Sequence, residues 1–508
     1  MDGKARCVAV FGSASDVGKS VVAAALCRVF RNTGFSVAPF KAQNMSNNSY
    51  VTAGGGEIGR AQAVQAECAG IAPTVDMNPL LLKPSTDSRS QMILHGKVIG
   101  SATAADFRKE RSGLFAKTQE SLEKLRAAHD VIVIEGAGSC AEMNLKDYDL
   151  ANFNTAIACG APVLLVADIG RGGVFAQVIG TLDLLSPAER AMVAGVIINR
   201  FRGDVSLFGD GIDFIERRSG VPVLGVLPYL QDMDIDPEDS VTLETIVDPP
   251  SVTAAGKINI AVIRLPRISN FTDFAPFMRE PSVNLSYLSK PRSLDGVDVL
   301  ILPGSKSTIA DLDWLREAGW EKIIGDYAKT GGRVIGVCGG YQMLGQTVND
   351  PHGVEGKPGS TRGLGLLDAR TTLEREKRLE RVRARWVEGG LDITGYEIHM
   401  GITEVAAGAA SPIEMILPDG TARPEGAMSA DGRVWGTYIH GVFDEPAFRR
   451  GFLLGINPDA WAGLAESSAA THKERQYDRL AEHFTKHVDT DKIIEITGVK
   501  RRVMEPIS

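Results

Sequence analysis

Short apolar runs that alternate with helical stretches constrain the fold of this chain most strongly. Over the first 230 residues these runs are rich in β-branched residues and nearly free of polar ones, as expected of strands covered on both faces. Helices between the strands supply the long crossovers that parallel strands need. We therefore expect an α/β fold with a parallel, doubly wound sheet here. The predicted strands are 7–11, 36–40, 131–134, 162–167, 193–198 and 223–227.

The length of 508 residues indicates more than one domain. The segment 231–257 is acidic, contains Pro249-Pro250 and lacks an apolar period, which is typical of a linker. A second set of predicted strands follows at 258–263, 297–302, 333–337 and 434–439. We predict a first domain at 1–230, a linker at 231–257, a second α/β domain at 258–490 and a tail at 491–508. Within the second domain, a Gly-rich surface loop is expected at 351–363 and a charged, solvated face at 373–385.

Composition and charge argue against several classes of protein. With 55 basic and 63 acidic residues the net charge is −8, so the basic face that non-specific nucleic-acid binding needs is not expected. No apolar run of about 18 residues and no signal-peptide pattern appears, which predicts a cytoplasmic protein without a membrane partner. The six cysteines form no CxxC pair, so neither a zinc site nor a disulfide framework is expected. The oligomeric state stays open.

A glycine-rich loop directly follows the first predicted strand. It reads Gly12-Ser-Ala-Ser-Asp-Val-Gly18-Lys19-Ser20 and precedes an amphipathic helical stretch. Such a turn aims backbone N–H groups at phosphate oxygens. Lys19 would reach the β- and γ-phosphates, and the Ser20 hydroxyl would hold Mg²⁺. The sequence thus predicts an ATP site formed by Gly12, Ser13, Asp16, Val17, Gly18, Lys19 and Ser20.

Residues at the ends of the neighbouring strands should complete this site, because ligands gather at the carboxyl ends of parallel strands. Glu135 ends one strand, and a buried carboxylate there is costly unless it is paired or binds a metal. We predict that it binds Mg²⁺ together with Ser20. Lys41 is expected to face the transferred phosphoryl group, with a surface lysine as the alternative. Asn199 is placed to read a base edge, with a helix cap as the alternative.

A second candidate site centres on Cys338, which lies between a predicted strand and a Gly-Gly turn that opens a helix. This arrangement is a nucleophile elbow, which exposes the thiol at a helix N-terminus and favours the thiolate. The N–H groups of Gly339 and of Gly304, in another turn after a strand, would form an oxyanion hole. His440 ends the strand at 434–439, so it should reach the same edge as Cys338 and act as its base.

The motifs GVCGGYQMLG and GTYIHG resemble the triad (class I) glutamine amidotransferases. The resemblance implies that Cys338 forms a thioester with glutamine and releases ammonia, with His440 as general base. That class carries a Glu two residues after the His, whereas this chain has Val442. The third member is therefore open between Asp444 and a backbone carbonyl. The phosphate loop, one residue longer than G-x4-G-K-[ST], resembles that of dethiobiotin synthetase.

The pairing of these two domains resembles the cobalamin-biosynthesis amidotransferases over about residues 5–490, with landmarks at 41–49, 56–62, 77–84 and 395–401. Gly170, two residues after Asp168, replaces an Asp that is usual in that family. The resemblance implies that ATP, Mg²⁺ and glutamine are used to amidate the b, d, e and g carboxylates of adenosylcobyrinic acid a,c-diamide through acyl phosphates. Contacts to this corrinoid are expected from Gln43, Asn44, Glu57, Tyr396 and His399.

Two other functions compete with this one. A cobyrinic acid a,c-diamide synthase would use the same chemistry on other carboxylates, but the segments 43–49 and 56–62 argue against it. A partitioning-type P-loop ATPase would need neither Cys338 nor His440. Such ATPases also carry a Lys early in the loop, where this chain has Ser13.

Overall fold

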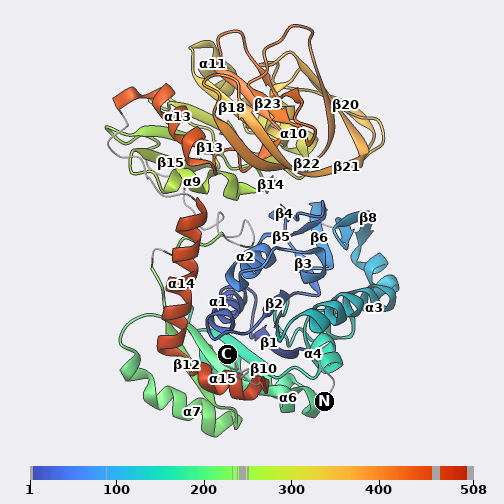
Figure 1. The fold of residues 1–508 in the computed structure, drawn as a ribbon, viewed down its shortest axis with the longest axis vertical. Helices are drawn as coiled ribbons and strands as arrows, with labels where there is room; N and C mark the ends of the chain where they lie inside the picture. Colours follow the sequence, from blue (N-terminus) through green and yellow to red (C-terminus); the bar gives the residue numbers. More distant parts are fainter. Residues whose placement is uncertain are drawn as a thin grey trace, which may run out of the picture.

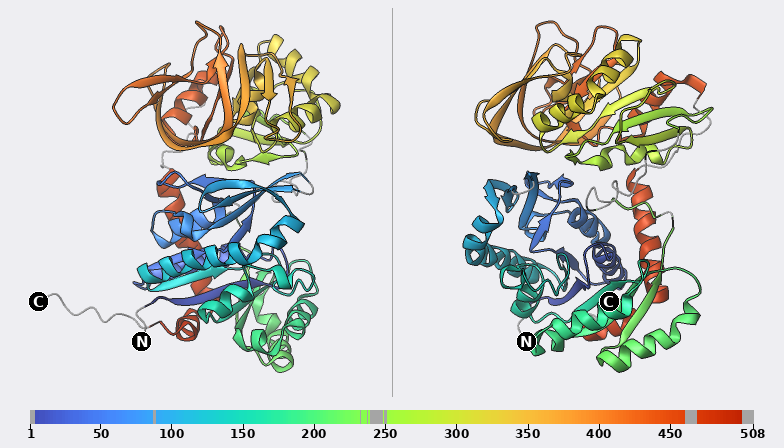
Figure 2. Two further views of the ribbon diagram at one scale, coloured as in Figure 1. Left: turned by 90° about the vertical axis from the view of Figure 1, so that its right-hand side faces the viewer. Right: turned by 180° about the vertical axis from the view of Figure 1, so that it is seen from behind.

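The computed structural model contains two α/β units stacked along the long axis of the molecule (Figure 1). It describes residues 4–86, 89–231, 233–236, 238, 248, 251–459 and 469–499. The N-terminal unit, coloured blue to green, lies below the C-terminal unit, coloured yellow to orange, and both views in Figure 2 show the same stacking. The two candidate sites therefore lie in different units that share a contact surface.

The first unit is built on a six-stranded parallel sheet in the order β12-β11-β10-β1-β9-β2, which confirms the parallel α/β prediction. Its strands are almost entirely buried because helices cover both faces. The strands are β1 (Arg6–Gly12), β2 (Val37–Phe40), β9 (Val131–Glu135), β10 (Val163–Asp168), β11 (Val193–Phe201) and β12 (Val223–Pro228). The helices are α1 (Lys19–Asn32), α2 (Arg60–Ala69), α3 (Ala104–Ala128), α4 (Phe153–Cys159), α5 (Val174–Leu184), α6 (Pro187–Met192) and α7 (Gly209–Ser219).

Two small sheets that the sequence patterns did not predict are inserted between β2 and α3. One has four strands in the order β3-β6-β7-β8, and the other pairs β4 with β5. Both lie at the top of the first unit and face the second unit (Figure 1). The strands are β3 (Gln43–Met45), β4 (Ser49–Val51), β5 (Glu57–Gly59), β6 (Leu80–Thr86), β7 (Arg89–Leu94) and β8 (Lys97–Thr103).

The second unit is built on the sheet β15-β13-β16-β18-β26-β25, which is parallel except for the pair β25 and β26. Predicted strands recur as β13 (Ile258–Ile263), β16 (Val299–Leu302), β18 (Arg333–Val337) and β26 (Val434–Thr437). The others are β15 (Val283–Leu288) and β25 (Ala427–Met428). The helices are α9 (Ala275–Met278), α10 (Thr308–Glu317), α11 (Trp320–Lys329), α12 (Gly339–Leu344) and α13 (Pro446–Ile456).

A seven-stranded sheet packs beside this one and is dominated by the long hairpin of β21 (Ala369–Trp386) and β22 (Asp392–Val405). The charged segment 373–385 forms most of β21, and its apolar side chains Leu373, Val382 and Ala384 are buried while several charged ones are exposed. Part of the expected loop 351–363 pairs as a strand. The remaining strands are β14 (Ile268–Ser269), β17 (Gly304–Ser305), β19 (Thr347–Asp350), β20 (Gly359–Arg362), β23 (Ile413–Ile416), β24 (Ala422–Glu425) and β27 (Ile439–His440).

The chain returns to the first unit at its C-terminal end. Helix α14 (Ala469–His487) packs along α1 and β12, and α15 (Thr490–Thr497) contacts β1. Apolar residues of α14 join the core under α1, and Arg28 pairs with Glu474 and Asp478. The predicted second domain at 258–490 thus differs from the structure. Helix α14 buries its apolar face on the first sheet rather than the second.

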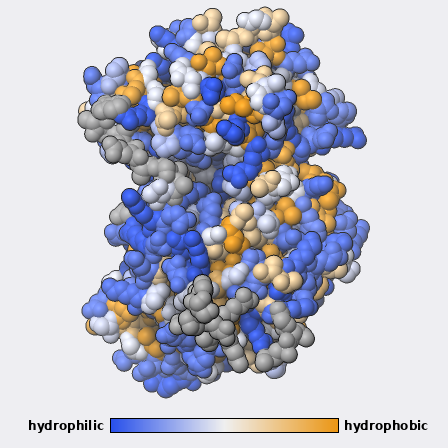
Figure 3. Space-filling view, in the orientation of Figure 1, coloured by the Kyte–Doolittle hydropathy of each residue, from blue (hydrophilic) through white to orange (hydrophobic). Residues whose placement is uncertain are grey.

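The face of the molecule in Figure 3 is mainly hydrophilic, with hydrophobic residues in smaller groups between the charged ones.

All six cysteines are free thiols. Among the described residues, none of the helices is long and apolar enough to cross a membrane.

Candidate functional site

The glycine-rich loop joins β1 to α1 at the carboxyl edge of the first sheet. Gly18 has a φ of 93°, and a Cβ at this position would lie 2.2 Å from Nδ2 of Asn199, so only glycine fits. The Lys19 ammonium donates to the carbonyls of Gly138 at 2.8 Å and Ala14 at 3.2 Å. Burial and the nearby Lys41 ammonium lower the pKa of Lys19. The loop therefore holds one buried lysine among backbone groups, as a phosphate site requires.

Four polar side chains meet beside the loop. Oγ of Ser20 donates to carboxylate oxygens of Glu135 and Glu238, each at 2.7 Å. The Lys41 ammonium donates to Glu135 at 2.8 Å and to Glu238 at 2.5 Å. Burial alone would lower the pKa of Lys41, but the two carboxylates raise it. The structure thus brings together Ser20, Glu135 and Lys41, and adds Glu238 from the segment expected to be a linker.

These donors fit a magnesium ion only in part. No group of three or more His, Cys, Asp or Glu able to hold a metal occurs in the described part of the chain. Mg²⁺, however, is commonly bound by one or two carboxylates plus phosphate oxygens and waters. A hydroxyl and a carboxylate 2.7 Å apart beside a phosphate loop suit that mode.

A cavity of about 340 Å³ lies beside α1 and is lined by Gly18, Ser20, Asn199, Tyr229 and Met233, among others. Its position and size suit the base of a nucleotide whose phosphates lie on the loop. Asn199 lies in β11, so it caps no helix. Its Nδ2 donates to the Val17 carbonyl at 2.8 Å, and its Oδ1 accepts from the Arg200 backbone. Its amide therefore holds the loop, and both of its polar atoms are engaged.

Three further predicted residues of the ATP site help to hold the loop. Asp16, whose φ is 54°, pairs with Arg200 at 2.9 Å. The Ser13 backbone donates to the Val166 carbonyl at 2.9 Å. Gly12 ends β1, and a Cβ there would lie 2.7 Å from the Ala14 carbonyl oxygen. These contacts fix the turn between strand and helix.

Cys338 forms a sharp turn between β18 and α12, with φ 53° and ψ −107°. The two glycines that follow, Gly339 and Gly340, allow other backbone segments of the protein to approach closely. A Cβ on Gly340 would lie 2.0 Å from the Leu302 carbonyl oxygen, and one on Gly339 would lie 2.7 Å from the Ser305 nitrogen. The strained turn at a helix N-terminus is the geometry of a nucleophile elbow.

His440 contacts a carboxylate that the sequence patterns did not reveal. Its Nδ1 lies 2.6 Å from Oδ2 of Asp273, and Oδ1 of Asp273 accepts from the Gly441 backbone at 3.1 Å. Burial alone would lower the pKa of His440, but Asp273 and Cys338 raise it to about 10. Nε2 of His440 is buried and has no hydrogen-bond partner among the described residues. The His440 ring is thus oriented by Asp273, not by Asp444 or a backbone carbonyl.

Replacing Asp273 by Asn should slow glutamine hydrolysis by about 10²–10⁴-fold, because the imidazole loses the group that fixes its tautomer and stabilises its cation. The pKa of His440 should fall, since Asp273 raises it. The alkaline limb of the pH–rate profile should therefore move to lower pH. Steady-state glutaminase assays across pH measure both effects. Asp444→Asn, beside Gly441, is the matched control, and equal losses in the two variants would contradict the assignment.

The two predicted oxyanion donors lie next to Cys338 and His440. A Cβ on Gly304 would lie 3.2 Å from Cε1 of His440, and Gly339 directly follows Cys338. Tyr396 stacks on His440 with ring centroids 5.3 Å apart. Its hydroxyl accepts from Arg60 at 2.9 Å. Tyr396 therefore links the histidine to the first unit rather than facing an open substrate cavity.

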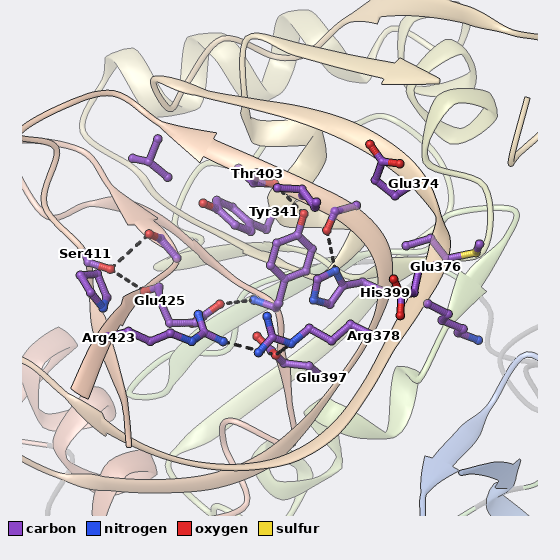
Figure 4. Close-up of a pocket in the computed structure, with 18 of the residues that line it drawn as sticks. Tyr341, Glu374, Glu376, Arg378, Glu397, His399, Thr403, Ser411, Arg423 and Glu425 are labelled. Atoms are coloured by element: carbon purple, nitrogen blue, oxygen red, sulfur yellow. Dashed lines mark hydrogen bonds and ion pairs between the residues drawn. The ribbon is translucent and has the colours of Figure 1, made fainter. Parts of the chain in front are cut away.

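One cavity adjoins Cys338, and a second lies next to the first. A narrow one of about 60 Å³ is lined by Cys338, Gln342, Lys306 and Lys83, the last from the first unit. A wider cavity of about 760 Å³ lies beside the narrow one and is lined mainly by residues of the β21–β22 hairpin (Figure 4). His399 lines both. It stacks on Tyr438 with centroids 3.7 Å apart, and burial lowers its pKa to about 3. His399 is therefore neutral.

Charged groups in the wider cavity are mostly paired with one another. Glu397 pairs with Arg378 at 2.6 Å and with Arg423 at 3.7 Å. Glu425 accepts from the Thr437 hydroxyl at 2.6 Å, and burial raises its pKa to about 7. Figure 4 shows Arg378 and Glu397, from the two long strands, and Arg423 and Glu425, from β24, arranged around this space.

A buried ion cluster joins the two units behind Cys338. Glu57 of β5 binds Lys83 of β6 at 2.8 Å and also binds Lys377 of β21. Burial alone would raise the pKa of Glu57, but the two lysines hold it well below its usual range. Burial also lowers the pKa of Lys377 to about 7 and that of Lys306 to about 8. Glu57 therefore stabilises the interface between the two units and does not face an open ligand site.

Replacing Glu57 by Leu should destabilise the protein by about 3–5 kcal/mol, because it leaves Lys83 and Lys377 buried without their shared carboxylate partner. The wild-type contribution is complete at neutral pH and is lost as the pH falls through the lowered pKa of Glu57. The midpoint of urea unfolding measures the change. Glu380→Gln, which removes an exposed partner of Arg378, should change stability by less than about 1 kcal/mol. Equal midpoints for the two variants would refute a role for the cluster.

The two remaining residues predicted to contact the corrinoid, Gln43 and Asn44, have different surroundings in the structure. Gln43 lines a large cavity beside α3. Asn44 is buried and donates to Gln62 at 2.9 Å, whose amide in turn donates to Glu135 at 3.3 Å. Asn44, Glu57 and Tyr396 are thus committed to internal contacts, and His399 lies in the second unit.

Comparisons with known proteins match both units of the chain. Residues 8–243 match the CobQ/CobB/MinD/ParA nucleotide binding domain, and residues 259–448 match the CobB/CobQ-like glutamine amidotransferase domain. The cobyric acid synthase of Chlorobium phaeobacteroides (strain BS1) is 52% identical over 97% of this chain and 99% of its own length. That of Sorangium cellulosum (strain So ce56) is 48% identical over 97% of this chain and 99% of its own length. The chain is a glutamine amidotransferase ligase and belongs to the cobyric acid synthase family.

Proposed function

We propose that this enzyme amidates the b, d, e and g carboxylates of adenosylcobyrinic acid a,c-diamide, consuming one glutamine and one ATP for each amide. The observation that carries the proposal is the combination in one chain of a Cys–His–Asp site with a phosphate loop that holds Lys19, Ser20 and Glu135. The relatives' names point to a corrinoid acceptor. All six cysteines are free thiols, which fits the cytoplasmic location that we propose for this enzyme.

In the second unit, the Cys338 thiolate attacks the amide carbon of glutamine. The elbow places Cys338 in the wall of the narrow cavity, and the N–H groups of Gly339 and Gly304 stabilise the developing oxyanion. His440, oriented by Asp273, gives a proton to the leaving ammonia and then activates the water that hydrolyses the thioester. Glutamine reaches Cys338 from the cavity of Figure 4, because His399, Met400 and Lys377 line both that cavity and the narrow one.

In the first unit, MgATP supplies the phosphoryl group that converts a poor electrophile, the carboxylate, into an acyl phosphate. Lys19 would turn from its carbonyl partners to the phosphates, and Ser20 and Glu135 would hold Mg²⁺, which would neutralise charge on the phosphate oxygens. Lys41 and Glu238 give up their ion pair with each other and contact the charges of the incoming phosphates and metal ion instead. Ammonia then displaces phosphate and forms the amide. Because free ammonia is mostly protonated near neutral pH, we expect it to travel along a shielded route between the units.

Mass spectrometry of the corrinoid after incubation with the protein, MgATP and glutamine tests this proposal. Each carboxylate converted to an amide lowers the mass by about 1 Da, and each step should release one phosphate. Four successive steps that require both ATP and glutamine are expected. An unchanged corrinoid with glutamine still hydrolysed would overturn the acceptor, and conversion of cobyrinic acid instead would favour the a,c-diamide synthase.

A further inference from the structure

A cavity of about 940 Å³ lies on the other side of the phosphate loop from the nucleotide-base cavity. It is enclosed by the start of α3, strands of the inserted four-stranded sheet, and the segment 137–154 that follows β9. The two cavities share no lining residue. Its volume is at the upper end of the range for small-molecule sites, so it suits a large ligand.

One wall of this cavity is the backbone that holds the phosphate loop. Gly138 and Cys140 line the cavity. The Gly138 carbonyl accepts from the Lys19 ammonium at 2.8 Å, and the Cys140 backbone donates to the Gly12 carbonyl at 3.0 Å. A carboxylate at this wall would therefore lie next to the lysine that meets the terminal phosphate. Transfer of a phosphoryl group requires that proximity.

Two arginines of α3 present positive charge to the cavity. Arg108 is exposed, and its guanidinium lies 4.4 Å from the centroid of the Tyr148 ring. Arg111 lies on the same helix face, three residues later. Its Nε is buried and donates no hydrogen bond within the described part of the chain. Both guanidinium groups line the cavity, where each offers the fork that binds carboxylates in bidentate fashion.

Acidic residues also line the cavity, but two of them are committed to the protein. Asp149 accepts from the backbone of Ala151 at 2.9 Å. Glu189 accepts from Lys146 at 2.6 Å. The others, Glu142 and Asp147, are exposed, so water screens their repulsion of an anionic ligand.

Apolar side chains make up much of the rest of the wall. Leu82 and Met92 are buried in a small core against which Phe107 packs. Met45 and Leu145 also line the cavity, although 54% and 49% of their surfaces are exposed. Large apolar side chains left in water beside a cavity mark a surface that a ligand covers.

We propose that this cavity binds the corrinoid acceptor, with its macrocycle on the apolar wall and its peripheral carboxylates on Arg108 and Arg111. This inference rests on the proposed function and adds the site and the groups that recognise the acceptor. Arginines that bind any carboxylate allow the ligand to bind in several orientations, so that different carboxylates reach the phosphate loop in turn. The site also favours the substrate, whose four target carboxylates are charged, over the product, in which the same four groups are uncharged amides.

Equilibrium dialysis of adenosylcobyrinic acid a,c-diamide against the full-length protein, without ATP or glutamine, tests the assignment. Visible absorption of the corrinoid reports binding. Arg108→Gln and Arg111→Gln should each raise the Kd at least about tenfold, since each removes a charge-assisted bidentate contact. Arg111→Lys should lose part of the affinity, because it keeps the charge and loses the fork. Lys109→Gln, on α3 but outside the cavity lining, is the matched control and should leave the Kd unchanged.

Dialysis of adenosylcobyric acid supplies a second readout. Wild-type protein should bind this product more weakly than the substrate, and the double arginine variant should lose most of that preference. Thermal unfolding midpoints show whether each variant is folded. Wild-type protein that binds neither corrinoid would overturn the proposed function. Tight wild-type binding that the folded arginine variants retain would overturn only this site.

Discussion

Cys338→Ser should reduce glutamine-dependent amidation by at least about 10³-fold, while amidation from added ammonium salts continues. The serine hydroxyl cannot replace the cysteine thiolate, which is a much stronger nucleophile. The phosphate loop lies in the other unit and is untouched by the substitution. Amide formation can therefore proceed whenever ammonia reaches the acyl phosphate from solution.

The matched control for this experiment is Cys159→Ser, at a half-buried thiol at the end of α4 in the first unit. It should retain both activities. Assays of glutamate, phosphate and corrinoid amide in parallel separate the two half-reactions. If Cys338→Ser also abolished ammonia-dependent amidation, the separation of nitrogen release from carboxylate activation would be wrong.

Lys19→Ala should have the opposite pattern and abolish amidation from either nitrogen source. This lysine is the buried ammonium within the loop, and loss of a charge that stabilises the transferring phosphoryl group costs about 10²–10³-fold or more. Glutamine hydrolysis at Cys338 should continue without amide formation, although the rate can change if the units communicate.

Lys4→Ala, which removes an exposed ammonium paired with Glu123, is the control for this variant and should behave as wild type. Phosphate release and amide formation are measured with both glutamine and ammonium as donors. Retained ATP-dependent amidation in Lys19→Ala would show that the loop does not bind the phosphates.

Local sequence patterns were sufficient for the features that depend on neighbouring residues. The parallel strands follow from continuous apolar runs, and the phosphate loop and the Cys338 elbow follow from glycines at positions of close backbone approach. The position of Glu135 at the end of β9 follows from the register of parallel strands, in which Val10 pairs with Glu135.

Features that depend on contacts between distant segments were not predictable in this way. Asp273 lies 167 residues before His440 and has no motif around it. Glu238 lies in an acidic segment that looks like a linker. Helix α14 is amphipathic, but its sequence does not specify which of the two sheets covers its apolar face. The strand β21 was hidden by its many charges, because only alternate side chains need to be buried.

The units are also joined at the level of single side chains. Arg60 of α2 donates to Tyr396, which stacks on His440. Asn270, three residues before Asp273, accepts from the Ser49 backbone at 3.0 Å. A change in the inserted sheets of the first unit can therefore reach both the base and its orienting carboxylate. If the acceptor binds beside these sheets as we propose, these contacts would couple acceptor binding to nitrogen release.

Tracing the amide nitrogen of glutamine tests most directly whether the two sites work as one enzyme. The protein is incubated with MgATP, adenosylcobyrinic acid a,c-diamide, ¹⁵N-amide glutamine and an excess of unlabelled ammonium. Mass spectrometry then gives the ¹⁵N content of each new amide. We predict amides that carry the glutamine label with little dilution, as expected of ammonia passed directly from Cys338 to the phosphate loop. Amides labelled only to the level of the bulk ammonium pool would contradict this transfer.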